Sequence, residues 1–326
     1  MSAGTFPLST NKNPGLRPVD PRRDLRQIAS LTDLCFGDSL DQNGRGAVRE
    51  MEARSRSGPL LWFLGSMSPN WQLGFVWFEN GKLVGNVSTQ MAEHDKATWL
   101  IANVAVHPDH RRRGLATALT AAATDLAQQN HARRVLLQVH QHNTGAFILY
   151  RDLGFEVITT RSTWERVSAL EPPPLTLPDL DIRPARRAEW ERDFNFVARH
   201  RATGFSWLHP LRQADWRPSF WRTLSNFLNG ARDEHWLAID TAGQLVGAFY
   251  LAAGFSTTDD LNVLVHPEWQ GRLERPLLAA ALRRLGRRPW SVRVDHPTPD
   301  DPTESALKEF GFRKIQTLVW MERKFK

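Results

Sequence analysis

Hydrophobic and polar residues follow two different periods along the first half of the chain, and these periods predict its elements. Alternating apolar residues around a Glu-Asn-Gly turn predict a hairpin with strands at residues 73–78 and 83–90. After Asp20-Pro21, an N-cap residue followed by a first-turn proline, apolar residues recur at helical spacing. This pattern predicts a helix with a buried stripe of Leu25, Ile28, Leu31 and Leu34.

The two periods continue to alternate further along. Strands are expected at residues 99–106, 135–139 and 155–166, with helices at residues 114–128 and 143–153 between them. Gly154 follows the second helix at the position where glycine commonly ends one. The prediction is a mixed α/β fold, with an antiparallel front to the sheet and a parallel pair of strands behind it.

The second half of the chain repeats short patterns of the first half in the same order. The offset drifts only from 166 residues (16 to 182) to 157 residues (165 to 322). The matching pairs begin at Leu16 and Ile182, Asn80 and Ala242, Val106 and Val265, Leu153 and Phe310, and Glu165 and Glu322. We interpret the chain as a duplicated domain. Three consecutive prolines within residues 171–180 indicate a linker between domains at residues 1–170 and 181–326.

Composition agrees with two soluble domains. The 326 residues are 41% hydrophobic and 24% charged, no apolar run reaches membrane-helix length, and the start does not resemble a signal peptide. We therefore expect a cytoplasmic protein without a membrane partner. The net charge of +7 is compatible with binding of nucleic acid, with binding of an anionic small molecule, or with a general preference of the organism for basic residues. Because the arginine runs are not interleaved with aromatic residues, nucleic acid is the less expected partner.

A single cysteine and scattered histidines limit the possible chemistry. Cys35 cannot form an internal disulfide or a cysteine metal cluster, and its apolar surroundings predict a packing role. The histidines near residues 107–142 lack a metal-ligand spacing, so no metal is expected.

Residues 104–117, Val-Ala-Val-His-Pro-Asp-His-Arg-Arg-Arg-Gly-Leu-Ala-Thr, carry the most chemical information. A strand, a tight loop and a helix start at a glycine form a phosphate cradle, because the first amides of a helix have no internal partner. An ordinary strand-to-helix turn with surface arginines is the alternative. The loop lacks the glycine spacing of nucleotide-triphosphate and dinucleotide binders.

A second segment follows about 30 residues later: Asn143-Thr-Gly-Ala-Phe-Ile-Leu-Tyr-Arg-Asp-Leu-Gly-Phe155. With the first loop, its Asn-x-x-Ala-x-x-Leu-Tyr-x-x-x-Gly-Phe pattern resembles the GNAT superfamily of N-acetyltransferases over residues 16–167. The duplication is similar to the tandem-GNAT architecture of mycothiol synthase, but with the first domain active. The resemblance implies two tandem domains, each a twisted mixed β-sheet flanked by helices.

The resemblance also implies roles for individual residues. The strand before the loop would splay from its neighbour at a bulge and pair with the pantetheine arm, while the loop amides would hold the pyrophosphate. Asn143 would contact the pantetheine arm as well as cap its helix. The implied acetyl-CoA contacts are Val104, Ala105, Val106, Arg111, Arg112, Arg113, Gly114, Leu115, Ala116, Thr117 and Asn143.

The implied reaction is direct attack of a primary amine on the thioester, with strand amides stabilising the oxyanion. Tyr150 would give a proton to the leaving thiolate, although a tyrosine at this position can also be a packing residue. Glu93 is the tentative base, followed by His94 and Asp95; a solvated turn, with water as base, is the alternative.

The second copy keeps the outline of the loop but changes its chemistry. Leu273 stands where Gly114 stands, Leu307 falls at the tyrosine position, and Asp300 falls at the asparagine position. We expect the leucine to block a pyrophosphate sterically, which would make the second domain a degenerate copy. Aromatic residues within 204–222, among them Trp216, Phe220 and Trp221, are either core packing or a wall of the acceptor pocket.

Three functions therefore remain open. The chain acetylates a small amine, which we expect more than a protein acceptor; or it acetylates protein N-termini; or it binds CoA as a regulatory module without turnover. Retention of Gly114 and Tyr150 favours catalysis. A homodimer is compatible with the sequence.

Overall fold

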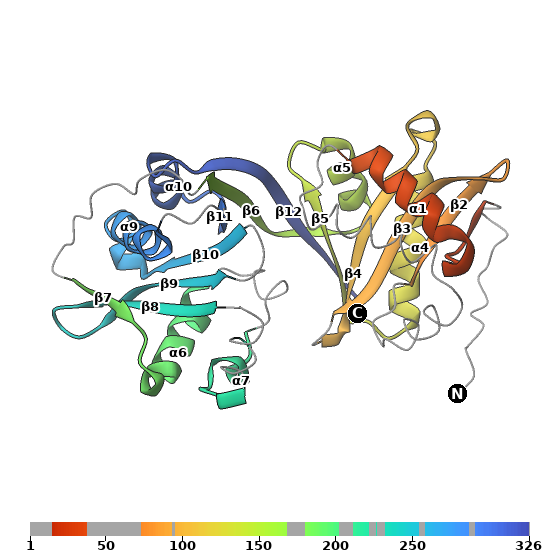
Figure 1. Cartoon of the computed structure of the whole chain (residues 1–326). Coiled ribbons are helices and arrows are strands. Elements are labelled where there is room, and N and C mark those ends of the chain that lie inside the picture. Colours follow the sequence, from red (N-terminus) through yellow and green to blue (C-terminus); the bar gives the residue numbers. More distant parts are fainter. Residues whose placement is uncertain are drawn as a thin grey trace. The chain divides into compact units, whose positions relative to one another are not determined.

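The computed structural model describes residues 15–37, 73–92, 95–167, 180–201, 211–221, 226, 232–253, 258–286 and 291–325. The chain forms two compact units (Figure 1). Unit 1 comprises Met1–Val139, Asn143–Glu156 and Met321–Lys326, and unit 2 comprises His140–His142 and Val157–Trp320.

Unit 1 is built on a mixed sheet with the strand order β1-β2-β3-β4-β5, followed by the C-terminal end of β12. The first four strands are antiparallel, and β4 and β5 are parallel. The elements are β1 (Leu16–Pro18), α1 (Pro21–Phe36), β2 (Leu73–Glu79), β3 (Lys82–Ala92), β4 (Asp95–Val106), η2 (Pro108–His110), α4 (Leu115–Gln129), β5 (Arg134–His140) and α5 (Thr144–Asp152).

Helices α1 and α4 cover opposite faces of this sheet (Figure 1). On one face, Ile28 and Leu31 of α1 pack against Val76, Leu83 and Ala105. The neighbour of Val76 in the strand, Trp77, points to the other face, because successive side chains in a strand alternate. On that face Leu119 of α4 packs directly on Gly85. A Cβ atom added to Gly85 would lie 2.9 Å from Cδ1 of Leu119.

Unit 2 repeats this plan with the strand order β12-β6-β11-β10-β9-β8-β7. Strands β10 and β11 are parallel, while β6 with β11 and the strands from β10 to β7 are antiparallel. Its elements are β6 (Glu156–Val167), β7 (Leu180–Pro184), η3 (Arg187–Glu189), α6 (Trp190–His200), α7 (Gln213–Trp216), β8 (Arg232–Asp240), β9 (Leu245–Ala253), β10 (Thr258–Val265), η5 (Pro267–Trp269), α9 (Glu274–Leu285), β11 (Ser291–Pro297), α10 (Asp301–Glu309) and β12 (Arg313–Lys324).

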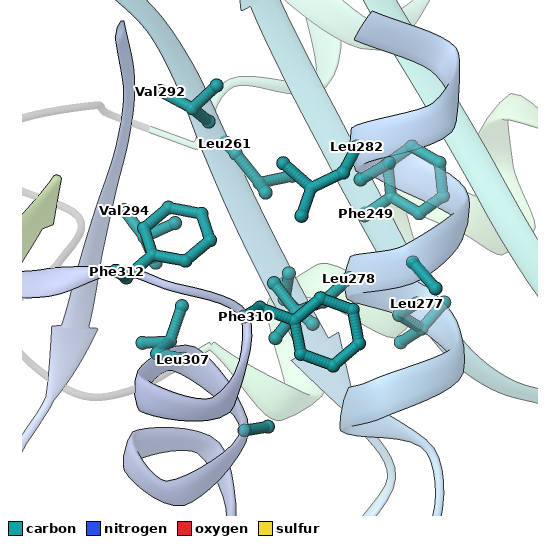
Figure 2. Packing of buried hydrophobic residues seen from close by; sticks show 14 of the residues in the cluster. Phe249, Leu261, Leu277, Leu278, Leu282, Val292, Val294, Leu307, Phe310 and Phe312 are labelled. Carbon is teal, nitrogen blue, oxygen red and sulfur yellow. The ribbon is translucent and has the colours of Figure 1, made fainter. Parts of the chain in front are cut away.

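The core of unit 2 lies between its sheet and helices α9 and α10. Figure 2 shows Leu277, Leu278 and Leu282 of α9 facing Phe249 and Leu261 of the sheet. On the side of α10, Leu307 lies with Phe310, Phe312 and Val294 in the same cluster.

The last strand of the first repeat lies in unit 2, and the last strand of the second repeat begins in unit 2 and ends in unit 1. Strand β6, which follows α5, pairs with β11 from Arg161 opposite Pro297 to Val167 opposite Ser291. Conversely, Met321–Lys326 at the end of the chain belong to unit 1, where the Phe325 amide donates to the Arg133 carbonyl at 2.9 Å. The domain limits at residues 170 and 181 describe the repeats along the chain and stay a prediction, and residues 171–179 lie outside the described residues.

The repeated Arg-Pro motif has a structural explanation. In unit 1, both terminal nitrogens of Arg17 donate to the buried carboxylate of Asp24 at 2.7 Å. In unit 2, Arg183 binds Glu189 in the same bidentate way and holds the pKa of Glu189 at about 2. Each arginine therefore ties its short first strand to the helical segment that follows, which is the type of contact for which arginine geometry is suited.

The predicted mixed α/β fold is confirmed, and the predicted strands and helices of the first half occur with small shifts of their ends. One detail of α1 is wrong: Leu34 is 56% exposed, and the buried face instead runs through Asp24, Ile28 and Leu31 toward Cys35. A strict three-residue repeat drifts by about 60° per step around a helix, so its fourth member leaves the buried face. No helix in the described parts of the chain is long and apolar enough to cross a membrane.

Candidate active site

Strand β4 and helix α4 are joined by a connection with unusual backbone conformations. The chain leaves the sheet at His107, whose amide donates to the Val84 carbonyl at 2.8 Å, and turns through η2. Arg112 has φ +62° and Gly114 has φ +80°, both in the left-handed region. These two residues reverse the chain so that α4 begins directly after the loop.

The N-terminus of α4 is uncapped. Gly114 occupies the cap position without a side-chain hydrogen bond, and the first backbone bond into the helix runs from the Ala118 amide to the Gly114 carbonyl. Within the described residues, the amides of residues 112–117 donate to no protein group. Unpaired donors at the positive end of a helix dipole form a binding site for an anion.

Gly114 keeps this cradle open. A Cβ atom built on Gly114 would meet nothing within 4 Å, so a side chain there would project into free space above the loop. The positive φ would also strain any other residue at this position. Both properties match a loop whose backbone approaches a ligand closely.

Two of the three loop arginines are held by protein groups. Arg113 binds Glu79 through both terminal nitrogens at 2.9 Å, and this contact lowers the pKa of Glu79. Arg111 donates from Nε to the Val106 carbonyl at 3.1 Å. Arg112 is exposed, and among the residues described here its guanidinium has no recorded partner. Arg112 is therefore the loop cation that is available to an anion.

Strand β4 is bulged and separates from β5 just before the loop. Asn103 has φ +52°, the register with β3 shifts between Asn86 and Ser88, and the buried Asn86 donates from Nδ2 to the Asn103 carbonyl at 2.9 Å. Pairing with β5 is recorded only from Thr98 to Leu100. The backbone of the following residues, which include Val104, Ala105 and Val106, therefore lacks a recorded partner on the β5 side.

Helix α5 presents the two residues singled out in the second sequence segment. Asn143 caps the helix, accepting from the Ala146 amide at 3.2 Å, and is exposed. Tyr150 is only 7% exposed and meets the Phe155 ring edge-on. Burial raises the pKa of Tyr150 to about 12, so its hydroxyl keeps its proton at neutral pH.

The structure describes every predicted cofactor contact and Tyr150 in unit 1, whereas Glu93 and His94 lie outside the described residues. The neighbouring Asp95 accepts from Thr98 and the Ala97 amide and faces Arg134, and these contacts lower its pKa. An ionised carboxylate held in this way is a poor proton acceptor. Sequence reasoning missed the Asn86–Asn103 contact, although asparagine is rare within strands and is one of the few residues that tolerate a positive φ.

The equivalent loop of unit 2 differs in a way that the sequence did not reveal. The expectation that Leu273 blocks the loop sterically is wrong, because its side chain is fully buried and packs against Gly247. The backbone of Leu273 has φ −103°. The loop is instead filled by Glu274, whose Oε1 accepts from the Gly271 amide at 3.0 Å. The Glu274 carboxylate therefore accepts the hydrogen bond that the Gly271 amide could otherwise donate to an external anion.

The second segment of unit 2 has also lost its polar residue. Leu307 is buried in the apolar cluster at the place equivalent to Tyr150, and the Phe312 amide donates to its carbonyl as the Phe155 amide donates to that of Tyr150. Asp300 has the same capping role as Asn143 and accepts from the Thr303 amide. Among the described residues there is no group of three or more histidine, cysteine or carboxylate side chains that could hold a metal ion.

Comparisons with known proteins match the part of the chain that carries this geometry. A model of the acetyltransferase (GNAT) family matches residues 41–155. The [ribosomal protein bS18]-alanine N-acetyltransferase of Escherichia coli (strain K12) is 31% identical over 129 residues, which are 39% of this chain and 84% of that enzyme. The mycothiol acetyltransferase of Saccharopolyspora erythraea is 29% identical over 225 residues, 63% of this chain and 70% of that enzyme.

Solved structures extend the likeness to the whole fold. A tandem GNAT protein from the clavulanic acid biosynthesis pathway covers 95% of this chain and 98% of its own, with a TM-score of 0.57 and 17% identity. A GCN5-related N-acetyltransferase from Sphaerobacter thermophilus covers 95% of both chains, with a TM-score of 0.61 and 16% identity. At this identity the two structures support the tandem fold alone.

The cradle of unit 1 thus lies in the segment that the family model matches, and a relative named as an N-acetyltransferase aligns with this chain over most of its own length. The chain belongs to the GNAT family of acetyltransferases and is an acyltransferase enzyme.

Proposed function

We propose that unit 1 transfers an acetyl group from acetyl-CoA to a primary amine, by direct attack within a ternary complex. The observation that carries this proposal is the open cradle at α4, where the amides of residues 112–117 and the guanidinium of Arg112 await an anion. The pyrophosphate of CoA is an anion of the right kind, and the amides of Arg112, Arg113, Gly114, Leu115, Ala116 and Thr117 would surround it, with Arg111 next to them.

The separation of β4 from β5 supports a place for the pantetheine arm. Its amides would pair with the backbone of Val104, Ala105 and Val106, which is not paired with β5, as an added strand does. Asn143 would contact the same arm from the start of α5 while it caps the helix.

In the reaction we propose, the neutral amine nitrogen attacks the thioester carbonyl carbon and forms the new C–N bond. Amides of β4 stabilise the resulting oxyanion. When the C–S bond breaks, the thiolate of CoA takes the proton of the Tyr150 hydroxyl, and the amine loses one proton to a base. Glu93 remains the proposed base, with water as the alternative, because the contacts of Asp95 keep it ionised and engaged.

The names of two relatives indicate the kind of acceptor. One relative is named for an alanine of a ribosomal protein and the other for mycothiol, so both a protein N-terminus and a small molecule have precedents. We infer a small-molecule amine, because mycothiol acetyltransferase matches the larger share of this chain. A chain that only binds CoA is the remaining rival.

Replacing Gly114 with leucine tests the cradle. We expect Gly114→Leu to weaken CoA binding by at least about 10-fold, since the new side chain fills the space above the loop and strains the backbone. Isothermal titration calorimetry with CoA gives the dissociation constant. The matched control is Gly243→Leu, which has φ +77° and equally open space in the β8–β9 turn. Unchanged affinity in Gly114→Leu, or equal loss in both variants, contradicts the site.

Release of free thiol from acetyl-CoA tests the reaction and the role of Tyr150. With a panel of small amines and an alanine-terminated peptide, we expect release with at least one acceptor. Tyr150→Phe lowers kcat about 100-fold and leaves the Kd for CoA unchanged, because it removes only a transferable proton. Tight CoA binding without release for any acceptor would favour the regulatory module. Equal kcat in Tyr150→Phe would leave the tyrosine as a packing residue.

An alkaline titration tests the environment of Tyr150, because the chain has only two tyrosines and both are shielded. Burial raises the pKa of Tyr150 to about 12, and burial together with the nearby Asp193 also raises the pKa of Tyr250 well above its ordinary value. Phenolate absorbance should therefore be absent in the folded protein at pH 10.5 and present in the unfolded chain, where tyrosine titrates at about 10.

The stability of the protein should follow the same shift. The contribution of neutral Tyr150 is complete below pH 10 and is lost as the pH rises toward 12, since only the unfolded state has given up its proton. At pH 11, wild type should lose about 1.4 kcal/mol of unfolding free energy that Tyr150→Phe keeps. Denaturant unfolding at pH 8 and 11 measures this difference. A phenolate signal from folded protein near pH 10 contradicts the buried environment.

A further inference from the structure

Unit 2 contains a cavity of about 370 Å³, a volume within the range of small-molecule sites. It opens where β10 and β11 approach the start of α9. Its apolar wall includes Val197, Leu211, Trp216 and Val263, and its polar wall includes Glu274 and His235. All its lining residues belong to unit 2.

Glu274 is the exceptional group in this cavity. The residue is 2% exposed, and its Oε1 accepts from the Gly271 amide at 3.0 Å. Its other oxygen, Oε2, is buried and has no hydrogen-bond partner. A carboxylate oxygen without a donor is costly inside a protein, and such groups mark places where a ligand completes the bonding.

The other carboxylates of the cavity wall already have donors. Asp295 accepts from Arg161 at 3.1 Å and from Thr163 at 2.6 Å. Asp300 accepts from His296 at 2.7 Å and caps α10. Arg201 also lines the cavity and has a partner of its own. Glu274 is therefore the acidic group on this wall with an unused acceptor.

A buried aspartate and the rings around it form another part of the cavity wall. The buried Asp193 binds His235 at 2.7 Å and the Tyr250 hydroxyl at 2.8 Å, which orients both rings at the cavity wall. Trp216 meets His235 edge-on with ring centroids 4.5 Å apart. Aromatic surface beside an acidic group favours an organic cation over a hydrated inorganic one.

We propose that the cavity of unit 2 binds a small organic molecule with an ammonium group, which donates a hydrogen bond to Oε2 of Glu274. In this proposal the duplicated fold has exchanged an anion site for a cation site, because the carboxylate bound to the loop amide belongs to a residue that lines the cavity and keeps a second oxygen without a partner. This site is separate from the acetyl-CoA site proposed for unit 1 and does not depend on it.

Ligand-observed NMR with the full chain tests this proposal. The probe is benzylammonium, and benzyl alcohol serves as a neutral molecule of similar shape. We expect benzylammonium to bind, and Glu274→Gln to weaken it about 10- to 100-fold, the effect of losing a hydrogen bond to a charged group. Benzyl alcohol should bind weakly and equally to both proteins.

Two further variants keep the result interpretable. Glu309→Gln removes the same charge from an exposed side chain that pairs with Arg275, and should leave binding unchanged. Leu211→Trp fills the cavity while Glu274 stays in place, and should abolish binding even if Glu274→Gln folds poorly. Equal binding of the two probes, no binding of benzylammonium to wild type, or full binding to Leu211→Trp would overturn the proposal. Normal binding of benzylammonium in Gly114→Leu would show that the two sites are independent.

Discussion

The amides at the start of α4 place the strongest constraint on this protein. Buried backbone N–H groups are normally hydrogen-bonded. The amides of the first turn of a helix have no acceptor within the helix, so they need a cap, water or a ligand. In unit 1 the left-handed backbone at Arg112 and Gly114 aims these amides at open space, and the bulge at Asn103 separates β4 from β5 directly before them. The loop with its unpaired amides thus directly follows a strand segment that is not paired with β5.

Unit 2 shows how the same fold satisfies the same demand internally. The chain keeps the strand, the short helical turn and the left-handed residue, here Gly271 in the place of Arg112. One substitution, Leu115 to Glu274 in the aligned loop, supplies a carboxylate to the amide of Gly271. The duplicated arginine pairs at Asp24 and Glu189 show that the scaffold stayed constant while the loop changed. The two units therefore share the arginine pair and the order of elements, and they differ in the loop and at the positions of Gly114 and Tyr150.

Much of the fold could be predicted from the sequence because its signals are local. The turn at Asn80-Gly81, the cap at Asp20 and the glycine after α5 each depend on neighbouring residues, and the elements they limit occur where expected. Contacts between distant residues were less accessible. The exposure of Leu34, the burial of Leu273 and the exchange of the last strands between the units depend on which face or which sheet a segment meets, and the hydrophobic period alone does not specify this.

The candidate site was also predictable where its signals are local and not where it depends on contacts between distant residues. Spacing placed the loop and Tyr150, but the contacts of Arg111 and Arg113, which leave Arg112 as the available cation, needed coordinates. Hydrogen–deuterium exchange with and without CoA reports whether the amides at the start of α4 bind CoA. We expect CoA to slow exchange of the amides of residues 112–117 and to leave exchange of the amides of residues 271–275 unchanged. Slower exchange at the loop of unit 2, or unchanged exchange at residues 112–117, would contradict the assignment of the CoA site to unit 1.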